Sequence, residues 1–278
     1  MRGRIPSIFE RGITMQNKTA LITGASGGIG YEFAKLLAKD CAVLVLVARS
    51  LDRLLEVKKE LESISDVSVS VMTIAKDLSK PGVAEEIYRE LKNENISVDI
   101  LINNAGIGNL GKFADTDWQK DAEMISLNIV ALTHLTKLFV KGMIERRSGK
   151  IVNVASTAAF QPGPLMAVYY ASKAYVLSFS EAIANELKGT GVNVTVLCPG
   201  PTATGFVKAA AMEESRLFKI RRPAKAVDVA RYGYEAMIKG KTVAIHGIIS
   251  KIVAFSTRLA PRHILPSISR RINENVRS

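Results

Sequence analysis

The sequence predicts an α/β fold in which a doubly wound, mostly parallel sheet of seven strands carries helices on both faces. Short runs of β-branched residues alternate about six times with longer amphipathic stretches, the pattern of parallel strands joined by crossover helices. The β-branched runs are almost continuously apolar, which fits strands that are buried on both sides. No internal repeat or low-complexity linker divides the 278 residues, so we expect a single domain.

The strands and helices are expected to alternate along the chain. Each predicted strand is a short β-branched run, and each predicted helix has apolar residues recurring every three or four positions. The predicted strands are 19–23, 41–48, 67–75, 98–104, 150–156, 192–198 and 241–246. The predicted helices between them are 30–39, 52–63, 81–94, 121–143 and 174–189.

Composition narrows the class of protein. The chain is 47% hydrophobic and 23% charged, which is ordinary for a globular protein with a buried core. The longest uninterrupted apolar run, 41–48, is far too short to span a bilayer. Cys41 and Cys198 lie in separate apolar runs and are expected to be buried thiols in a reducing compartment. The three histidines are scattered, so we expect no metal site.

The net charge of +12 lies largely at the two ends of the chain. Residues 251–278 hold six basic residues and one acidic residue, and the body has no basic stripe interleaved with aromatic residues. We therefore expect no nucleic-acid partner. Residues 1–14 are expected to be an upstream extension or an expression remnant, and 15–246 the main domain, with a lid at about 201–222. Residues 247–278 are expected to form a basic amphipathic extension.

A glycine-rich turn joins the first predicted strand to the first predicted helix. Gly24, Gly28 and Gly30 lie in "TGASGGIG" (23–30), where a tight turn needs positive φ or a close backbone approach to a ligand. The following helix directs its free N–H groups and positive dipole end at the turn, ideally toward a pyrophosphate. The spacing departs from the standard G-x-G-x-x-G pattern, and a purely structural turn is the alternative. The strand before it and the helix after it favour dinucleotide binding.

The end of the second predicted strand indicates which dinucleotide is bound. An NAD site usually has an acidic residue there to bind the ribose 2′-hydroxyl. Arg49 and Ser50 stand there instead, and a guanidinium binds a 2′-phosphate through paired hydrogen bonds. The sequence therefore favours NADP over NAD, with a merely solvated arginine as the alternative. Asp77, which ends the third predicted strand, is placed to bind the adenine amino group or to cap the next helix.

Six motifs, in order along the chain, resemble the short-chain dehydrogenase/reductase family over about residues 15–245. They are "TGASGGIG" (23–30), "NNAG" (103–106), Asn128 in "SLNIVAL", Ser156 in "IVNVAS", "YYASK" (169–173) and "PGPTAT" (199–204). The resemblance implies a Rossmann-like single domain that binds NAD(P) and transfers a hydride to or from a carbonyl or alcohol carbon of a small molecule. It also implies a cytoplasmic enzyme of the carbonyl reductase or alcohol dehydrogenase type that forms a homodimer or homotetramer.

A tyrosine and a lysine carry the expected proton chemistry. Tyr169 and Lys173 are four residues apart, so on a helix their side chains lie on one face. A phenol titrates near ~10, but an adjacent ammonium and the positive nicotinamide of the oxidised cofactor stabilise the phenolate. We therefore expect a lowered pKa for Tyr169, which would act as general acid in carbonyl reduction or as general base in alcohol oxidation. Tyr170 is the rival phenol, but it occupies the variable position of the Y-x-x-x-K pattern.

The resemblance also assigns roles to the other catalytic residues. Ser156 would hydrogen-bond the substrate oxygen and stabilise the charge that develops on it. Asn128 would support a water that relays protons to Lys173, which would also hold the nicotinamide ribose. Taken singly, these residues have plain alternatives: a serine in a turn, an asparagine in a helix and a lysine on a solvated face. The expected catalytic set is Asn128, Ser156, Tyr169 and Lys173.

The remaining motif residues are expected to surround the cofactor. Thr204 would bind the nicotinamide carboxamide. Asn104 and Gly106 would pack beside the adenosine ribose, or would only shape their own turn. The expected cofactor-binding set is Gly24, Ser26, Gly28, Ile29, Gly30, Arg49, Ser50, Asp77, Asn104, Ala105, Gly106, Tyr169, Lys173, Pro199, Gly200, Thr202 and Thr204.

Two segments are expected to shape the substrate pocket, 157–168 and 205–220. Both are rich in Phe, Met, Leu and Ala, which suits an apolar substrate such as a lipid-like, steroid-like or aromatic ketone. Ordinary core and lid packing is the alternative. The basic run "KIRR" (219–222) would bind an acidic group or cap the lid.

The C-terminal extension contains an apolar series near helical spacing. Pro261 and Pro266 interrupt the pattern. Such a helix would dock on its own domain or on a neighbouring subunit, or would make weak peripheral contact with a membrane. The series is Ile248, Ile249, Ile252, Val253, Phe255 and Leu259.

Two other functional classes compete with an enzyme. One is a non-catalytic nucleotide-sensing regulator on the same scaffold, and the intact serine, tyrosine and lysine set disfavours it. The other is a scaffold for nucleic acid or membranes that uses the basic ends, and no recognition module in the sequence supports it.

Overall fold

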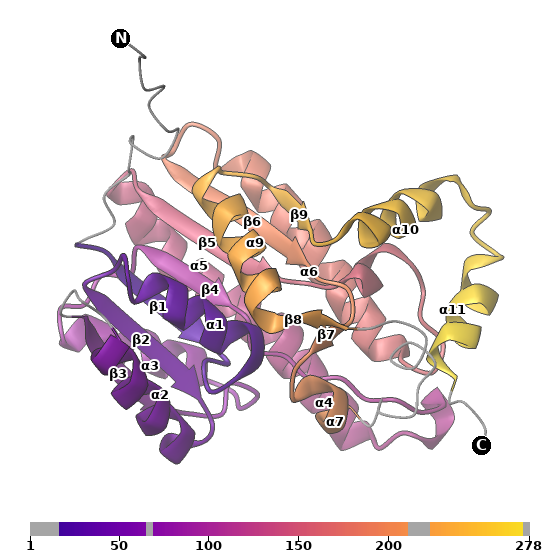
Figure 1. The fold of residues 1–278 in the computed structure, drawn as a ribbon, viewed down its shortest axis with the longest axis horizontal. Coiled ribbons are helices and arrows are strands. Elements are labelled where there is room, and N and C mark those ends of the chain that lie inside the picture. The colour runs from indigo at the N-terminus through magenta and orange to yellow at the C-terminus, as the bar shows by residue number, and fades with distance from the viewer. Residues whose placement is uncertain (1–16, 65–68, 211–222, 275–278) are drawn as a thin grey trace, which may run out of the picture.

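A parallel sheet forms the centre of the molecule. The structure is a computed structural model, and it describes residues 17–64, 69–210 and 223–274. Seven strands pair in the order β3-β2-β1-β4-β5-β6-β9, and every pairing is parallel (Figure 1). This confirms the predicted doubly wound α/β fold. The strands are β1 (Thr19–Thr23), β2 (Val43–Ala48), β3 (Ser70–Ala75), β4 (Ile100–Asn103), β5 (Gly149–Val154), β6 (Val192–Cys198) and β9 (Val243–Ile245).

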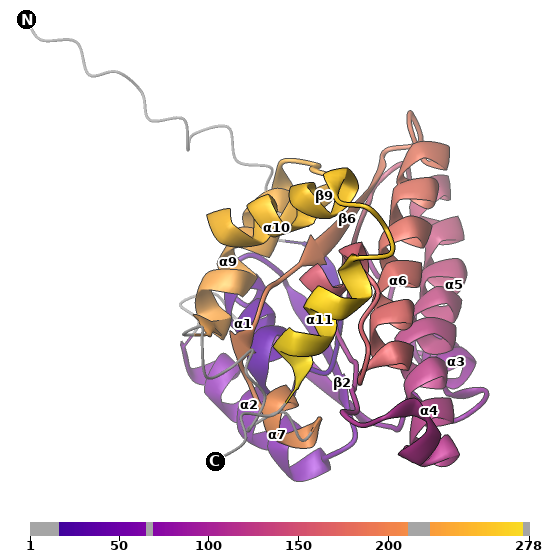
Figure 2. The same ribbon diagram turned by 90° about the vertical axis from the view of Figure 1, so that its right-hand side faces the viewer.

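Helices cover both faces of the sheet. Helices α1 (Gly28–Leu37), α2 (Leu51–Ile64) and α9 (Ala226–Ile238) share one apolar core with the strands. Helices α3 (Val83–Asn93), α5 (Leu132–Glu145) and α6 (Ala167–Glu186) pack into a second core on the other face (Figure 2). Because strand residues alternate between the two cores, as Leu21 and Ile22 do, each strand must be apolar along its length.

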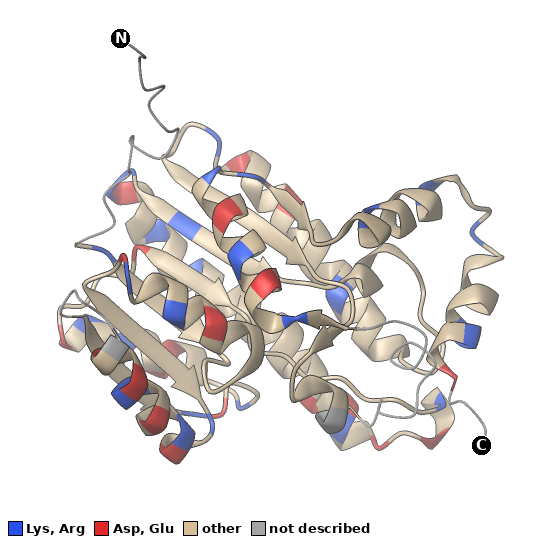
Figure 3. Cartoon of the chain, viewed as in Figure 1, with Lys and Arg blue, Asp and Glu red and all other residues tan. Residues whose placement is uncertain are grey.

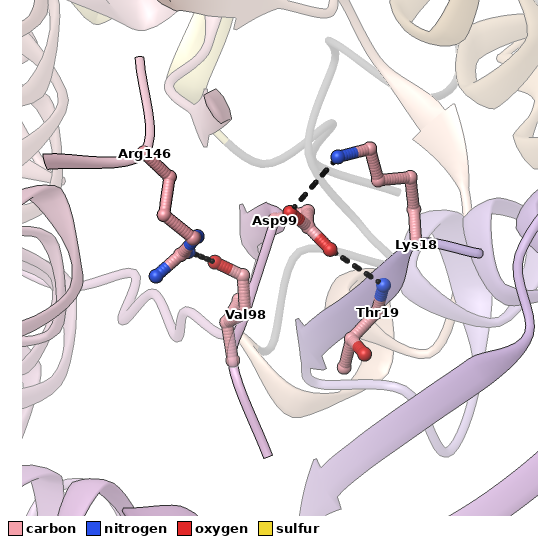
Figure 4. A network of polar contacts seen from close by, with 5 residues as sticks. All are labelled: Lys18, Thr19, Val98, Asp99 and Arg146. Atoms are coloured by element: carbon pink, nitrogen blue, oxygen red, sulfur yellow. Dashed lines mark hydrogen bonds and ion pairs between the residues drawn. The ribbon is translucent and has the colours of Figure 1, made fainter. Parts of the chain in front are cut away.

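The sheet is fastened at the amino ends of its central strands. The carboxylate of Asp99, one residue before β4, accepts hydrogen bonds from the Thr19 backbone N–H at 3.0 Å and from Lys18 Nζ at 3.2 Å. The Arg146 guanidinium donates to the carbonyl oxygen of Val98 at 2.8 Å (Figure 4). These contacts join the start of β1, the start of β4 and the end of α5. They help fix the register of the two strands whose opposite ends form the site.

The predicted helices at 121–143 and 174–189 differ from the observed ones. The first is a continuous stretch in which α4 (Trp118–Ile125) leads through a π-helical turn, Ser126–Ala131, into α5. By length and composition the stretch Trp118–Glu145 is apolar enough to cross a membrane, but it packs on α3 and α6 as a core helix. The second begins at Ala167 rather than at residue 174, so Tyr169 and Lys173 are both helical, as their predicted pairing requires.

Several short elements and one long helix were not predicted. They are α9 and a small parallel sheet of β7 (Thr202–Ala203) and β8 (Ala224–Lys225), with η2 (Phe113–Asp115) and η4 (Thr157–Phe160). The short helix α7 (Phe206–Ala209) lies in the segment 205–220, which was expected to contain a loop and a helix. The expected N-terminal extension at 1–14 lies outside the described residues, as do residues 211–222, which include the "KIRR" segment and part of the expected lid. The proposed domain boundaries stay predictions.

The C-terminal extension forms two helices, α10 (Ile248–Leu259) and α11 (Leu265–Asn273). Figure 1 shows both on the side of the molecule away from β3. Pro266 lies in the first turn of α11, where a missing N–H is tolerated, so this proline begins a second helix. Ser250 and Ala254 of α10 and Leu265, Ser269 and Asn273 of α11 are buried, so both helices dock on their own domain.

Candidate functional site

A cavity of about 710 Å³ lies at the carboxyl ends of the strands. Every residue predicted to bind the cofactor lines this cavity except Gly30, and every predicted catalytic residue lines it except Asn128. These two lie immediately behind its wall, as their contacts described below show. The position agrees with the rule that open α/β sheets bind ligands beyond the carboxyl ends of their strands.

The turn between β1 and α1 has the geometry of a phosphate cradle. Gly24 and Gly28 have φ angles of +66° and +56°, a region that favours glycine. A Cβ at Gly30 would collide with the Asn104 side chain and the Gly24 carbonyl, and one at Gly28 would lie 3.0 Å from Thr204 Cγ2. The N-terminus of α1 opens onto the same space. These features fit the pyrophosphate of a dinucleotide.

Asn104 acts as a structural bracket for the glycine turn. Its side-chain Nδ2 donates to the carbonyl oxygens of Thr23 at 2.9 Å and Gly24 at 3.2 Å. The Thr23 hydroxyl accepts from the backbone N–H groups of Asn104 and Ala105, both at 3.0 Å. The structural role considered for "NNAG" is therefore present, although Asn104, Ala105 and Gly106 also line the cavity.

The corner of the cavity at the ends of β2 and β3 is basic. Arg49 and Ser50 are exposed there, and within the described ranges Arg49 forms no ion pair. Burial would raise the pKa of Asp77, but hydrogen bonds from Ser79 and the positive charge of Arg49 lower it overall. The Asp77 carboxylate accepts from Ser79 N at 3.0 Å and from Ser79 Oγ at 2.8 Å, so it organises the turn after β3. The predicted alternative, a cap on the next helix, is wrong, because Gly82 is the N-cap of α3 and the Asp77 carboxylate bonds within the preceding turn.

Lys173 is held by the neighbouring strand. It is 5% exposed, and its Nζ donates to the carbonyl oxygen of Val154 at 2.9 Å. Its Nζ lies 5.8 Å from the centroid of the Tyr169 ring, so the two side chains share one face of α6, as predicted. Burial lowers the pKa of Lys173 to about 8, and this ammonium therefore loses its proton more readily than an exposed lysine does.

The pKa of Tyr169 differs from the prediction. Among the groups of this chain, burial raises the pKa of the phenol, and a smaller opposing contribution comes from the Ser156 hydroxyl. The lowering expected from the lysine is absent because the ammonium lies beside the ring and bonds to Val154. The protein alone therefore keeps Tyr169 in its protonated form, and only the cofactor charge is left to oppose that preference.

Asn128 joins three segments behind the catalytic residues. It is 1% exposed within the π-helical turn, an element often found at functional sites. Its Oδ1 accepts from Ile107 N at 3.0 Å, while its Nδ2 donates to Ile107 O at 2.9 Å and to Ser172 Oγ at 3.0 Å. A Cβ at Gly106 would lie 3.2 Å from this Oδ1 and 3.3 Å from Lys173 Nζ. Asn128 therefore positions the loop after β4 against α6.

Ser156 and Thr204 line the cavity from the segments that follow β5 and β7. Ser156 caps η4, its Oγ accepting from Ala158 N at 3.1 Å, and it lines the cavity close to Tyr169. Thr204 Oγ1 accepts from Phe206 N at 3.3 Å, and its methyl group faces the glycine turn. Pro199 and Gly200, which follow β6, also line the cavity with Thr202.

Both segments predicted to shape the substrate pocket line one end of the cavity. Thr157, Ala158, Gln161 and Met166 come from the segment 157–168, and Gly205 and Phe206 come from the segment 205–220. The Phe206 ring packs against Tyr169 with 5.3 Å between ring centroids. Val253 of α10 and Ile272 of α11 also line the cavity, so the C-terminal extension forms part of its wall.

A buried hydrogen-bond chain fixes α11 against this wall. The Tyr170 hydroxyl donates to Asn273 Oδ1 at 3.0 Å, and Asn273 Nδ2 donates to the carbonyl oxygen of Pro164, also at 3.0 Å. Asn273 is fully buried, and it joins α6, the loop before α6 and the C-terminal helix. Tyr170, considered above only as a rival acid, thus has a structural partner. No local sequence signal marks the pair, because its members are 103 residues apart.

Comparisons with known proteins agree with this geometry. A family model described as short chain dehydrogenase matches residues 18–215. The ketoacyl reductase HetN of Nostoc is 32% identical over 233 residues, covering 84% of this chain and 79% of that protein. A very-long-chain 3-oxoacyl-CoA reductase of Phaeosphaeria nodorum is 38% identical over 179 residues. That match covers 63% of this chain and only 52% of the longer relative.

A solved structure shows the same fold with a cofactor bound. The short-chain dehydrogenase from Sphingobium yanoikuyae in complex with NADPH has a TM-score of 0.77 and 29% sequence identity. The match covers 87% of this chain and 93% of that one.

The pH dependence of cofactor use tests the state of Lys173. The ratio kcat/KM for NADPH reports the free enzyme, so it should fall as the pH rises through about 8, where the ammonium becomes a neutral amine. Steady-state rates at saturating ketone from pH 6 to pH 10, roughly the range that brackets this titration, measure it. A profile that stays flat up to the pKa of an exposed lysine would contradict the burial argument.

Removing the Tyr170 hydroxyl tests the hydrogen bonds that hold α11. Tyr170→Phe leaves the buried Asn273 Oδ1 without its donor, which should loosen the wall and raise KM for an apolar ketone about fivefold or more. The value of kcat and the affinity for NADPH should change little. Ser267→Ala, an exposed change on the same helix, is the control. A Tyr170→Phe protein with unchanged KM would show that the hydrogen bonds of Asn273 do not shape the pocket.

Proposed function

This chain belongs to the short-chain dehydrogenase family, and from that premise we propose that it is an NADP(H)-dependent reductase of apolar carbonyl compounds. The observation that carries the proposal is the meeting of three parts in one cavity. The glycine turn, the basic corner at Arg49 and the Tyr169–Lys173 face of α6 all line it. An oxidoreductase with a nicotinamide cofactor agrees with the enzymes it resembles.

The residues of the chain divide the reaction between them. A bound nicotinamide supplies the hydride that reduces the carbonyl carbon. Tyr169 donates its phenolic proton to the carbonyl oxygen, and Ser156 hydrogen-bonds the same oxygen as negative charge develops on it. Lys173, held against Val154, would hold the cofactor ribose. Asn128 keeps the loop after β4 and α6 at a fixed separation, so that these groups stay aligned.

The direction of reduction rests on the names of two relatives, ketoacyl reductase and very-long-chain 3-oxoacyl-CoA reductase. Burial raises the pKa of Tyr169, so the phenol carries the proton that reduction needs, and the charge of a bound cofactor must act against this burial for the proton to leave. The charged form of Lys173 predominates below about 8, so near neutral pH the acid and its supporting cation are present together.

The cofactor preference rests on the corner at the end of β2. Arg49 is exposed beside the cavity, and no carboxylate follows β2 that would bind a ribose 2′-hydroxyl and repel a 2′-phosphate. A guanidinium pairs with phosphate through two hydrogen bonds, which supports NADP over NAD. The neighbour from Sphingobium yanoikuyae is in complex with NADPH.

The substrate end of the cavity supports an apolar ketone. Most of the described side chains there are apolar, and such a lining would desolvate an aliphatic chain at little cost. Two relatives carry the names ketoacyl reductase and very-long-chain 3-oxoacyl-CoA reductase. We take 3-oxoacyl chains as the first substrates to try. The apolar lining residues are Ala158, Met166, Phe206, Val253 and Ile272.

Three further expectations stay proposals. The enzyme would work in the cytoplasm, it would assemble as a homodimer or homotetramer, and its C-terminal helices would contact a membrane. The last of these rests on the outer face of α10.

A regulator without catalysis is the competing function, and the complete Ser156, Tyr169 and Lys173 set in one cavity counts against it.

Replacing the proposed acid separates an enzyme from a sensor. Tyr169→Phe removes the proton donor and should lower NADPH oxidation with a 3-oxoacyl ester by about 10²- to 10⁴-fold. NADPH binding, followed by quenching of protein fluorescence, should persist and serves as the control for folding. If the wild type binds NADPH but neither it nor the variant oxidises the cofactor with any ketone of a broad panel, the regulator is favoured.

A charge change at Arg49 tests the cofactor preference. Arg49→Ala should weaken NADPH binding about tenfold or more, because a charge-assisted pair with the 2′-phosphate is lost, and should leave NADH binding nearly unchanged. Arg53→Ala is the matched control, since Arg53 is an exposed neighbour that pairs with Glu56 outside the cavity. Equal effects of Arg49→Ala on the two cofactors would contradict a 2′-phosphate site.

A further inference from the structure

Helix α10 has a second apolar face that the fold does not cover. Its inner face carries the buried Ser250 and Ala254, and Val253 beside them lines the cavity. On the opposite side, four large apolar side chains follow one another at helical spacings of four, three and four residues. Each is 61–75% exposed, far more than an apolar residue on a core-facing stripe. They are Ile248, Ile252, Phe255 and Leu259, and we call them the outer stripe.

The described surface around the outer stripe is mainly basic, and Glu274, just after α11, pairs with Arg270 at 3.3 Å. Residues 247–273 contain five basic residues and no aspartate or glutamate. Figure 3 shows Lys and Arg on α10, on the connection to α11 and on α11, whereas both signs are mixed on α2 and α3. Ile264 and Ile268 add exposed apolar side chains at the start of α11. The basic residues are Lys251, Arg258, Arg262, Arg270 and Arg271.

The arrangement matches the physical requirements of an interfacial helix. An apolar stripe enters the boundary of headgroups and acyl chains, while flanking cations stay at the level of the headgroups. Lys251 and Arg258 lie one position before Ile252 and Leu259, so they project beside the stripe rather than opposite to it. Basic side chains next to such a stripe add attraction to anionic lipids that a neutral membrane does not provide.

A second copy of this chain is a poorer occupant of the outer stripe. A two-fold dimer brings the same patch of both subunits together. Contact through α10 would therefore bring Lys251 and Arg258 of one copy near the same residues of the other, with no acidic residue on α10 to separate them. Such like-charge contacts oppose association, whereas an anionic surface neutralises all of them at once.

We propose that the outer stripe of α10, with its flanking basic residues, docks the protein on a membrane surface that contains anionic lipids. The docked helix is the same one whose inner face lines the cavity, so the membrane and the site lie on opposite sides of one helix. Docking needs no ligand in the cavity, and the proposal is therefore independent of the reaction assigned above.

Vesicle binding by the full chain tests the proposal. Sedimentation is measured with vesicles of phosphatidylcholine alone and of phosphatidylcholine with about one phosphatidylglycerol in three lipids. The double variant Ile248→Ser and Ile252→Ser should lower binding to the anionic vesicles about tenfold or more. Leu51→Ser with Leu55→Ser on α2 is the matched control, because these two leucines have the same spacing and are also exposed. Its binding should equal that of the wild type.

Charge and salt provide the second arm of the test. Lys251→Gln with Arg258→Gln should reduce binding to anionic vesicles toward the level for phosphatidylcholine alone, and raising the salt to about 0.5 M should have a similar effect. NADPH binding by fluorescence quenching should be the same in all variants, since none of these residues lines the cavity. This readout shows that the variants remain folded.

Three outcomes would overturn the proposal. The first is a wild-type protein that sediments with neither type of vesicle. The second is equal loss of binding in the α10 and α2 double variants, which would show a general effect of exposed apolar residues. The third is a wild-type dimer that only the α10 variant dissociates, since the occupant of the outer stripe would then be a second copy.

Discussion

The side-by-side parallel pairing of β1, β4, β5 and β6 is the constraint on which the site depends. Parallel strands end at the same edge, so the glycine turn, the loop after β4, Ser156 and the segment after β6 must meet there whatever their distance in sequence. The Asp99 contacts fix the amino ends of β1 and β4, and the Thr23 hydroxyl joins their carboxyl ends. A shift between these strands would move the cofactor cradle relative to the loop that Asn128 holds.

Burial shifts the pKa values of Tyr169 and Lys173 in opposite directions. It favours the neutral forms of both groups, so it raises the pKa of Tyr169 and lowers that of Lys173. For a phenol the neutral form carries the proton that the proposed reduction needs, but a raised pKa also makes it a weaker acid. For lysine the neutral form is the one that binds anions and ribose oxygens less well. In the proposed reaction the protonated tyrosine and the charged lysine are therefore present together only below about pH 8.

Local patterns were sufficient to predict the sheet and most of the cofactor wall. Glycine at positive φ, continuously apolar strands and a tyrosine four residues before a lysine are each visible within a few residues of sequence, and the structure confirms their placement. What escaped prediction depends on contacts between distant segments. The partnership of Tyr170 with Asn273, the lining roles of Val253 and Ile272, and the burial of Tyr169 are consequences of where the C-terminal helices and Phe206 pack. The contribution expected from Lys173 to the pKa of Tyr169 is absent for the same reason, since helical spacing indicates that two groups are near but not how dry they are.

The C-terminal extension shows how one helix can satisfy two environments. The inner face of α10 carries the small residues Ser250 and Ala254, which let the helix approach η4 closely. Val253 on the same side of the helix reaches the cavity. Ile248, Ile252, Phe255 and Leu259 are placed on the other side, the reverse of the pattern expected if burial on the domain were the only requirement. Helix α11 has the ordinary arrangement, with Leu265, Ser269 and Asn273 buried and its arginines exposed. The two helices belong to one extension, so the difference between their exposed faces is the observation that the proposed membrane contact of α10 would explain.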